Sequence, residues 1–151
     1  MQIRGVRPPV DLEVARQLLA IQRAAYAVEA ALIGDDRIPP LHEELVDLRR
    51  APLRWLSAVI DDRVVGAVAW QETADAVDID RLMVAPDAYR QGVGSALVRE
   101  VVRRAGTRHT TVSTGRDNTP ARSLYERLGF SPVGDREVIP CLWVTQYVRV
   151  P

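Results

Sequence analysis

The sequence has 151 residues, of which 47% are hydrophobic and 26% are charged, and this fits one globular domain over residues 1–151. Its 20 basic residues, all of them arginine, balance its 20 acidic residues, so no net field draws the protein to nucleic acid or to an anionic membrane. A single cysteine, Cys141, excludes an intrachain disulfide and a thiolate metal cluster. Met1 is not followed by a signal-peptide pattern, and no run of about 18 apolar residues occurs, so we expect a cytoplasmic protein.

The N-terminal third combines one strand pattern with two helix patterns. Residues 2–7 alternate weakly and end at two prolines, which is typical of a short first strand. Apolar residues at helical spacing over residues 14–32 predict an amphipathic helix. Residues 33–41 carry turn residues and a Pro-Pro break, and residues 42–50 predict a second, short helix. Because this linker is the least periodic part of the chain, we expect it to line a variable substrate cleft.

The middle of the chain predicts three antiparallel strands. Residues 55–60 and 64–71 are rich in strand formers and are joined by a polar turn, as in a hairpin. Residues 77–84 alternate polar and apolar residues and form the third strand. By this alternation, Asp78, Asp80 and the apolar positions that follow should share one face.

A glycine turn links the third strand to a helix. Gly92 and Gly94 precede a segment with helical spacing that closes at Gly106. The first turn of a helix leaves N–H groups unpaired and carries the positive end of the helix dipole, so this junction favours a phosphate. The alternative is an ordinary tight loop. A dinucleotide fingerprint is excluded because Leu97 stands where the third glycine belongs, and a P-loop is excluded because Ser95 follows Gly94.

The C-terminal part predicts a strand at residues 110–114, a helix and two final strands. Thr119 is placed to cap the helix, with Pro120 at its first position. The last strands, residues 135–139 and 142–149, are separated by a proline. Since no histidine or asparagine stands at a suggestive spacing from Cys141, we expect a buried or neutral thiol and not a nucleophile.

Two segments, LMVAPDAYRQGVGSAL from Leu82 and NTPARSLYERLGF from Asn118, stand in a characteristic order and spacing. Together they resemble the GNAT superfamily of N-acyltransferases. The resemblance covers residues 78–130. It implies a strand, pyrophosphate loop and helix that hold acetyl-CoA, and direct acetyl transfer to a primary amine with neither a metal nor a covalent enzyme intermediate. Members are often homodimers.

The expected fold class is α/β. The pattern of elements predicts a mixed, largely antiparallel sheet of about seven strands with helices on both faces. The resemblance adds a V-shaped splay between the fourth and fifth strands, residues 77–84 and 110–114, where acyl-CoA would enter.

The resemblance also implies which residues bind the acyl donor. Main-chain groups of the strand would bond the pantetheine arm, and the glycine turn would hold the phosphates. One departure is Tyr89, which stands where the family usually has Arg or Gln, and Arg90 is an alternative source of that side chain. The expected cofactor-binding residues are Leu82, Met83, Val84, Arg90, Gln91, Gly92, Val93, Gly94, Ser95 and Asn118.

Three residues are candidates for the chemistry. Tyr125 would hydrogen-bond the departing sulfur, and as a core aromatic it needs only its hydroxyl at the site. An amine with a pKa of about 10.4 must lose a proton before it attacks, at a cost of about 4 to 5 kcal/mol at neutral pH. Family members commonly place a glutamate at the position of Asp78 or Asp80, so either aspartate could act as the base, through a relaying water. The alternative for both is an exposed strand edge or an ion pair with a neighbouring arginine.

Two functions of different classes therefore follow from the sequence. The first is an N-acetyltransferase whose acceptor is an antibiotic, a polyamine, an amino acid, a peptide N-terminus or a protein lysine. The second is a non-catalytic acyl-CoA-binding sensor or partner domain of the same fold, which the departure at Tyr89 and the missing strand glutamate favour and Tyr125 opposes. A nucleic-acid-binding domain is disfavoured by the charge balance.

Overall fold

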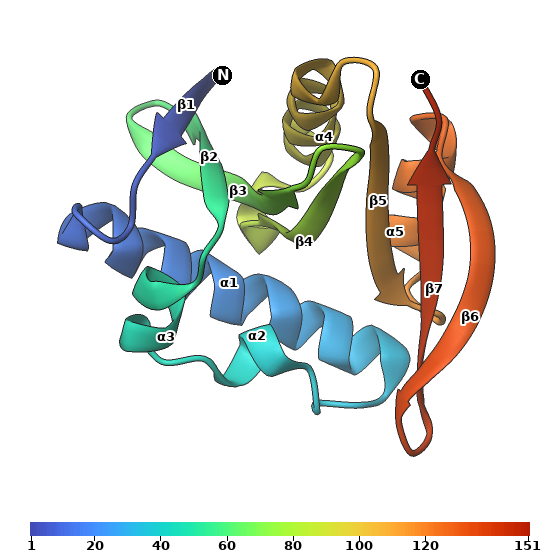
Figure 1. The fold of residues 1–151 in the computed structure, drawn as a ribbon. Helices are drawn as coiled ribbons and strands as arrows, with labels where there is room; N and C mark the ends of the chain where they lie inside the picture. The colour runs from blue at the N-terminus through green and yellow to red at the C-terminus, as the bar shows by residue number, and fades with distance from the viewer.

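The computed structural model describes residues 1–151 as one seven-stranded sheet with helices on both faces (Figure 1). The strand order is β1-β2-β3-β4-β5-β7-β6, and every neighbouring pair is antiparallel except β4 and β5. The expected fold class is confirmed. The strands are β1 (Gln2–Val6), β2 (Arg54–Ile60), β3 (Arg63–Glu72), β4 (Ala76–Val84), β5 (His109–Gly115), β6 (Ser131–Ile139) and β7 (Leu142–Arg149).

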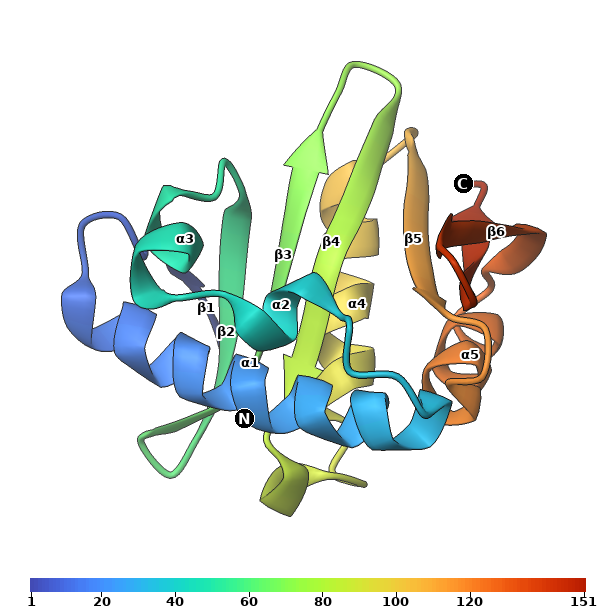
Figure 2. The ribbon, with the colours of Figure 1, turned by 90° about the horizontal axis from the view of Figure 1, so that it is seen from below.

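The helices cover opposite faces of the sheet. Figure 2 shows α1 crossing one face from the β1 edge to α5, with α4 behind the strands. One hydrophobic cluster joins α1 and α3 to the sheet, and a larger one joins α4 and α5 to the other face. None of the helices combines the length and the hydrophobicity that a membrane span requires. The helices are α1 (Leu12–Ile33), α2 (Pro39–His42), α3 (Leu45–Arg50), η1 (Pro86–Ala88), α4 (Val93–Ala105) and α5 (Thr119–Arg127).

The sheet opens between β4 and β5. The two strands pair only where Ala76–Ile79 face His109–Val112, which is the N-terminal part of each strand. Beyond this point β4 keeps only β3 as a partner, and β5 keeps only β7. The expected splay between the fourth and fifth strands is therefore confirmed, and it leaves backbone groups of β4 without a strand partner on the β5 side.

A β-bulge in β4 corrects the predicted alternation. Consecutive residues of β3 pair with Ile79 and Arg81, so Asp80 is an extra residue in β4. An extra residue exchanges the two faces of a strand from that point onward. Ile79 and Leu82 consequently pack on the α4 side, whereas Arg81 points to the α1 side. The prediction that Asp78 shares a face with the apolar positions after Asp80 was wrong.

Two helix boundaries also differ from the prediction. Residues 42–50 do not form one helix: α2 begins at Pro39, inside the predicted loop, and α3 begins only at Leu45. The helix is interrupted because Glu44 caps α3 in a reciprocal capping box with Asp47. Thr119 is not the cap of α5. Asn118 has that role, since its side chain accepts a hydrogen bond from the Ala121 N–H at 3.2 Å.

Cys141 lies in the turn between β6 and β7 and is exposed, so of the two expected alternatives, a buried or a neutral thiol, the buried one was wrong. Its φ of +68° is a left-handed conformation that allows the chain to reverse between the two strands. Strand β6, one of the two edge strands of the sheet, begins at Ser131 and is longer than the predicted residues 135–139.

Candidate active site

A cavity of about 710 Å³ lies where the sheet opens. Its walls come from β4, from the second half of α1, from the first turn of α4 and from the length of α5. The expected cofactor-binding residues that line it are Leu82, Met83, Val84, Arg90, Gly92, Val93, Gly94, Ser95 and Asn118. Gln91 does not line the cavity. The structure therefore gathers residues from two separate sequence segments around one space.

The glycine turn presents the N-terminus of α4 to this cavity. Gly92 has a φ of +76°, and it ends the loop without a side-chain cap on the helix. The first hydrogen bond of the helix is donated by Ala96 to the Gly92 carbonyl, which leaves the preceding N–H groups available to a ligand. A methyl group at Gly94 would stand 3.5 Å from the Leu124 side chain and 3.7 Å from that of Val84. Glycine thus keeps open the space above these N–H groups, as close approach of an anion requires.

Tyr89 and Arg90 also line the cavity, immediately before the turn. Arg90 adopts a left-handed φ of +66°, and its guanidinium takes part in no ion pair of the chain. A free cation next to a helix N-terminus adds to the attraction of a phosphate. Arg90 is therefore placed to supply the side chain that Tyr89 cannot.

A second cavity, of about 210 Å³, adjoins the first. The two share lining residues from α1, β4 and α5: Tyr26, Glu29, Leu82, Asn118 and Ala121. The other walls of the second cavity are the end of β5, the α1–α2 connection and the β6–β7 hairpin. Two ligands, one in each cavity, would thus meet at the opening between β4 and β5.

Tyr125 lines the second cavity and is otherwise enclosed, with 3% of its surface exposed. Its ring packs edge-on against Phe130, with ring centroids 5.5 Å apart, and lies 6.0 Å from the ring of Tyr147. Burial, and then the negative charge of Glu29, raise the pKa of Tyr125. The hydroxyl is therefore neutral near pH 7 and can donate a hydrogen bond into the cavity.

The two candidate aspartates differ in position. Asp80, at the bulge, lines the second cavity together with Tyr125, and it accepts a hydrogen bond from Arg81 Nε at 2.6 Å. Asp78 lines neither cavity and accepts a hydrogen bond from the Thr111 hydroxyl at 2.6 Å. The structure thus brings Asp80 to the site and leaves Asp78 outside it.

A buried polar network behind Asp80 was missed by the sequence analysis. Arg81, only 7% exposed, donates to Glu43 at 2.6 Å and to Gln22 at 3.1 Å. Gln22 in turn donates to Glu43 at 2.9 Å and to the Pro40 carbonyl at 2.8 Å. The network joins α1, the α2–α3 connection and β4. One sequence signal could have indicated it: Gln22 is a polar residue within the apolar stripe of the first helix.

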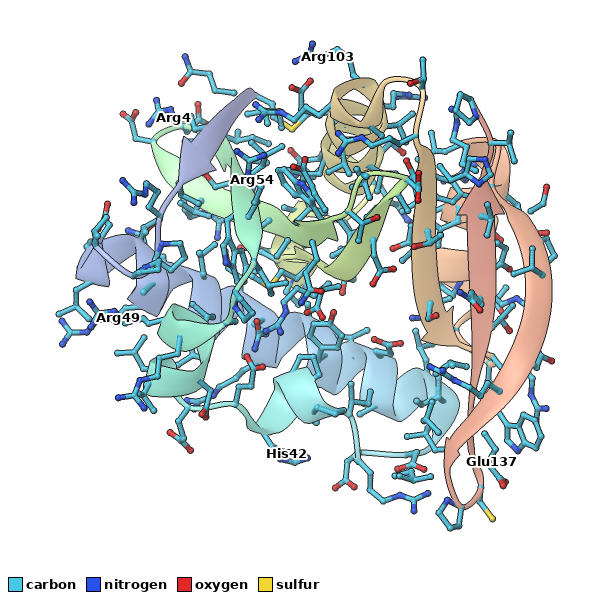
Figure 3. All side chains as sticks on the ribbon, in the orientation of Figure 1. Arg4, His42, Arg49, Arg54, Arg103 and Glu137 are labelled. Atoms are coloured by element: carbon cyan, nitrogen blue, oxygen red, sulfur yellow. The ribbon has the colours of Figure 1, made fainter.

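His42 does not belong to the site. It lies on α2, at the outer edge of the molecule (Figure 3). Glu137, on β6, also lies at the outer edge. The Nε2 atom of His42 stands 2.6 Å from the Asp36 carbonyl oxygen, and His42 lines neither cavity. A local structural role fits this position.

Comparison with known proteins agrees with the geometry. A sequence model of the acetyltransferase (GNAT) family matches residues 16–130. Over 80% of this chain, the sequence is 35% identical to UPF0157 protein YqkA of Bacillus subtilis. The chain spans only about a third (35%) of the length of YqkA. It is 29% identical to the peptidyl-lysine N-acetyltransferase YjaB of Salmonella typhimurium, over 83% of both chains. A solved aminoglycoside 6'-N-acetyltransferase complexed with coenzyme A has a TM-score of 0.75 at 14% identity, over 99% of this chain and 97% of that one.

The sheet that opens between β4 and β5, the glycine turn and the sequence match define the class: the chain belongs to the acetyltransferase (GNAT) family. The TM-score of 0.75 shows that the chain shares its fold with the solved structure, and at 14% identity this similarity shows nothing beyond the fold.

Proposed function

We propose that this protein transfers an acetyl group from acetyl-CoA to a primary amine by direct attack. The observation that carries the proposal is the meeting of the two cavities: the glycine turn lines the first, Tyr125 lines the second, and they join where β4 and β5 part. Membership of the family supports acetyl transfer in general, and a structural neighbour complexed with coenzyme A supports the choice of donor.

The first cavity suits the donor. N–H groups of residues 92–95 and the guanidinium of Arg90 bind the diphosphate, since both present positive charge to the same space. Backbone groups of Leu82 to Val84 have no strand partner on the β5 side and bond the pantetheine arm. One of these N–H groups also polarises the thioester carbonyl as an oxyanion donor.

The second cavity holds the acceptor and the groups that move protons. The amine nitrogen attacks the thioester carbonyl carbon, an amide bond forms, and the carbon–sulfur bond breaks. The Tyr125 hydroxyl donates a hydrogen bond to the departing sulfur. Full proton transfer from an ordinary phenol to a thiolate is uphill by about 2 kcal/mol, and the raised pKa of Tyr125 makes it more so. Asp80 takes the proton that the ammonium must lose, through a water because of its short side chain.

The test measures acetyl-CoA turnover with a panel of primary amines and monitors it through the release of free thiol. Binding of coenzyme A is measured in parallel by calorimetric titration. We expect coenzyme A to bind and thiol release to depend on the amine. Absence of heat on titration with coenzyme A would overturn the proposal.

The second candidate, a non-catalytic acyl-CoA-binding domain, is favoured by two observations: Tyr89 replaces the usual Arg or Gln, and the bulge residue is an aspartate paired with Arg81. It predicts binding of acetyl-CoA without thiol release for any amine. A homodimer and a cytoplasmic location stay predictions.

A further inference from the structure

Glu29 occupies a place at the site that no sequence signal indicated. It lies near the C-terminal end of α1, is half-buried, and lines both cavities. It is the only acidic residue around the first cavity, and it shares the second with Asp80 alone. Its Oε1 atom stands 3.4 Å from the position that a methyl group would take at Gly115, at the end of β5. The carboxylate therefore lies at the β5 side of the opening between the two strands.

The charge of Glu29 is not balanced within the chain. None of the ion pairs includes it. Asp80, by contrast, is paired with Arg81 at 2.6 Å, and Asp35, close to the end of α1, is paired with Arg37 at 2.6 Å. A bound cation stabilises an unpaired carboxylate in a half-buried site, because it compensates for the lost hydration of the charge.

The field of Glu29 reaches the reacting end of the site. After burial, its negative charge is the largest contribution that raises the pKa of Tyr26 and of Tyr125. Both tyrosines line the second cavity, so the carboxylate is close to the place where the acceptor nitrogen must stand.

We propose that Glu29 binds the acceptor's ammonium group and that the acceptor is a compact amine with a single positive charge and an apolar body. This inference rests on the proposed acetyl transfer and names its substrate class. Glu29 determines acceptor affinity, while Tyr125 and Asp80 serve the chemical step.

The second cavity supplies the argument for a compact, apolar body. At about 210 Å³ it is smaller than the roughly 300 to 1,000 Å³ of sites for drug-sized ligands. Beyond the shared rim, the charged side chains are the paired Asp80 and Arg81, and most of the others are aliphatic: Ile33, Ile38, Pro39, Pro40, Val112, Val138, Leu142 and Val144. One unpaired carboxylate balances one ammonium group, so a polyamine or an aminoglycoside would bring charges that this cavity leaves unpaired.

The experiment compares wild-type protein with Glu29→Gln and Glu29→Asp. Glu13→Gln is the matched control, since Glu13 lies exposed in the first turn of the same helix and its side chain only accepts a hydrogen bond from Gln17. Benzylamine and isobutylamine represent compact monoamines, and spermidine and kanamycin represent polycations. We expect Glu29→Gln to raise the KM for benzylamine by roughly 10- to 100-fold, the range expected for one charged hydrogen bond, with little change in kcat or in the KM for acetyl-CoA.

The charge-retaining variant Glu29→Asp should recover part of the affinity, and Glu13→Gln should match wild type. An unchanged amine KM in a folded Glu29→Gln protein would overturn the role of Glu29. A higher kcat/KM for spermidine or kanamycin than for both monoamines would overturn the substrate class.

A binding measurement separates this inference from the proposed function. Benzylamine is titrated calorimetrically into protein saturated with coenzyme A, so that no turnover is needed. Weaker binding to Glu29→Gln supports the inference even if the wild type acetylates no amine, an outcome that would count against acetyl transfer alone. Equal binding to both proteins would contradict the inference.

Discussion

Tyr125 and Tyr147 are two buried tyrosines with neighbouring rings, but their hydroxyl groups have different surroundings. The Tyr147 hydroxyl accepts a hydrogen bond from Arg122 at 3.0 Å and donates one to Glu126 at 3.1 Å. No fully buried side-chain nitrogen or oxygen of the chain lacks a partner. The Tyr125 hydroxyl, which bonds to no residue of the chain, therefore reaches the second cavity. This contrast separates a hydroxyl available for chemistry from one used for stability.

Tyr125→Phe should lower kcat by at least about tenfold, the effect expected of one hydrogen bond to a charged group such as the departing thiolate. The free energy of unfolding should change by less than about 0.5 kcal/mol, because no hydrogen bond within the chain is lost. Steady-state kinetics and urea unfolding measure the two quantities.

Tyr147→Phe is the matched control, and the opposite pattern is expected: kcat is retained while about 1 to 3 kcal/mol of stability is lost, because Arg122 and Glu126 lose a buried partner. If both variants lose stability equally and neither loses kcat, Tyr125 has only a packing role.

The proposed role of Tyr125 predicts how activity depends on alkaline pH. A phenol donates its proton only below its pKa, so a pKa above the ordinary value of about 10 extends the active range upward. We expect the kcat of wild-type protein to show no decline caused by tyrosine ionisation below about pH 10. A pH profile of kcat that falls with an apparent pKa of about 8 to 9, and no longer does so in Tyr125→Phe, would contradict this assignment.

At the scale of elements, β4 shows what a sequence pattern can and cannot predict. The strand, its polar and apolar residues and the following glycine turn are visible in the sequence, because each depends on neighbouring residues. The bulge at Asp80 depends on how β4 pairs with the preceding strand, β3, and the polar and apolar alternation of β4 alone does not reveal that pairing. For this reason the sequence did not separate Asp80, inside the site, from Asp78, outside it. Glu29 was missed for a related reason, since only the packing of α1 brings it to the end of β5.

The Arg81 network predicts that three elements lose stability together. Arg81→Met removes a buried guanidinium and leaves the Glu43 carboxylate and the Gln22 amide without it. We expect a loss of about 3 kcal/mol in the free energy of unfolding, as for a buried ion pair with one partner removed. Urea denaturation measures it.

Arg63→Met provides the comparison, because the Arg63 pair with Asp87 is exposed and should be worth less than about 1 kcal/mol. A similar effect of both substitutions would mean that the buried network contributes no more than a surface pair.

A substitution at Gly94 should affect helix stability and ligand binding in opposite directions. A methyl group there makes ordinary contacts in the absence of ligand, and alanine favours a helix by about 0.8 to 1 kcal/mol over glycine. We therefore expect Gly94→Ala to unfold at an equal or higher denaturant concentration and to bind coenzyme A at least about tenfold more weakly, because the methyl group fills the approach to the α4 N–H groups. Unchanged affinity for coenzyme A, measured by calorimetry, would place the phosphates elsewhere.

At the scale of the whole molecule, the sheet consists of two parts joined by few backbone bonds. Strands β1 to β4 form one part and β5 to β7 the other, with parallel pairing over four residues of each strand between them (Figure 1). The first cavity has walls from β4 and α4 in one part and from α5 in the other. A ligand that contacts both parts should therefore hold them together.

Coenzyme A at 100 times its dissociation constant should raise the free energy of unfolding by about 2.7 kcal/mol. Beyond this mass-action effect, we expect amide hydrogen exchange to slow at the C-terminal end of β4, at the start of α4 and in α5 together, since the ligand spans all three. Protection confined to α4 would contradict the view that the ligand joins the two parts.

The short contact between β4 and β5 has a consequence for colloidal behaviour. Unpaired strand backbone normally invites another polypeptide to add itself, which is a common origin of aggregation. Here the unpaired segment is set within a cavity bounded by α1, α4 and α5. The three helices around the segment screen it from a second protein chain. The segment of β4 that lacks a partner strand therefore does not bring the risk of aggregation that an exposed edge strand would bring.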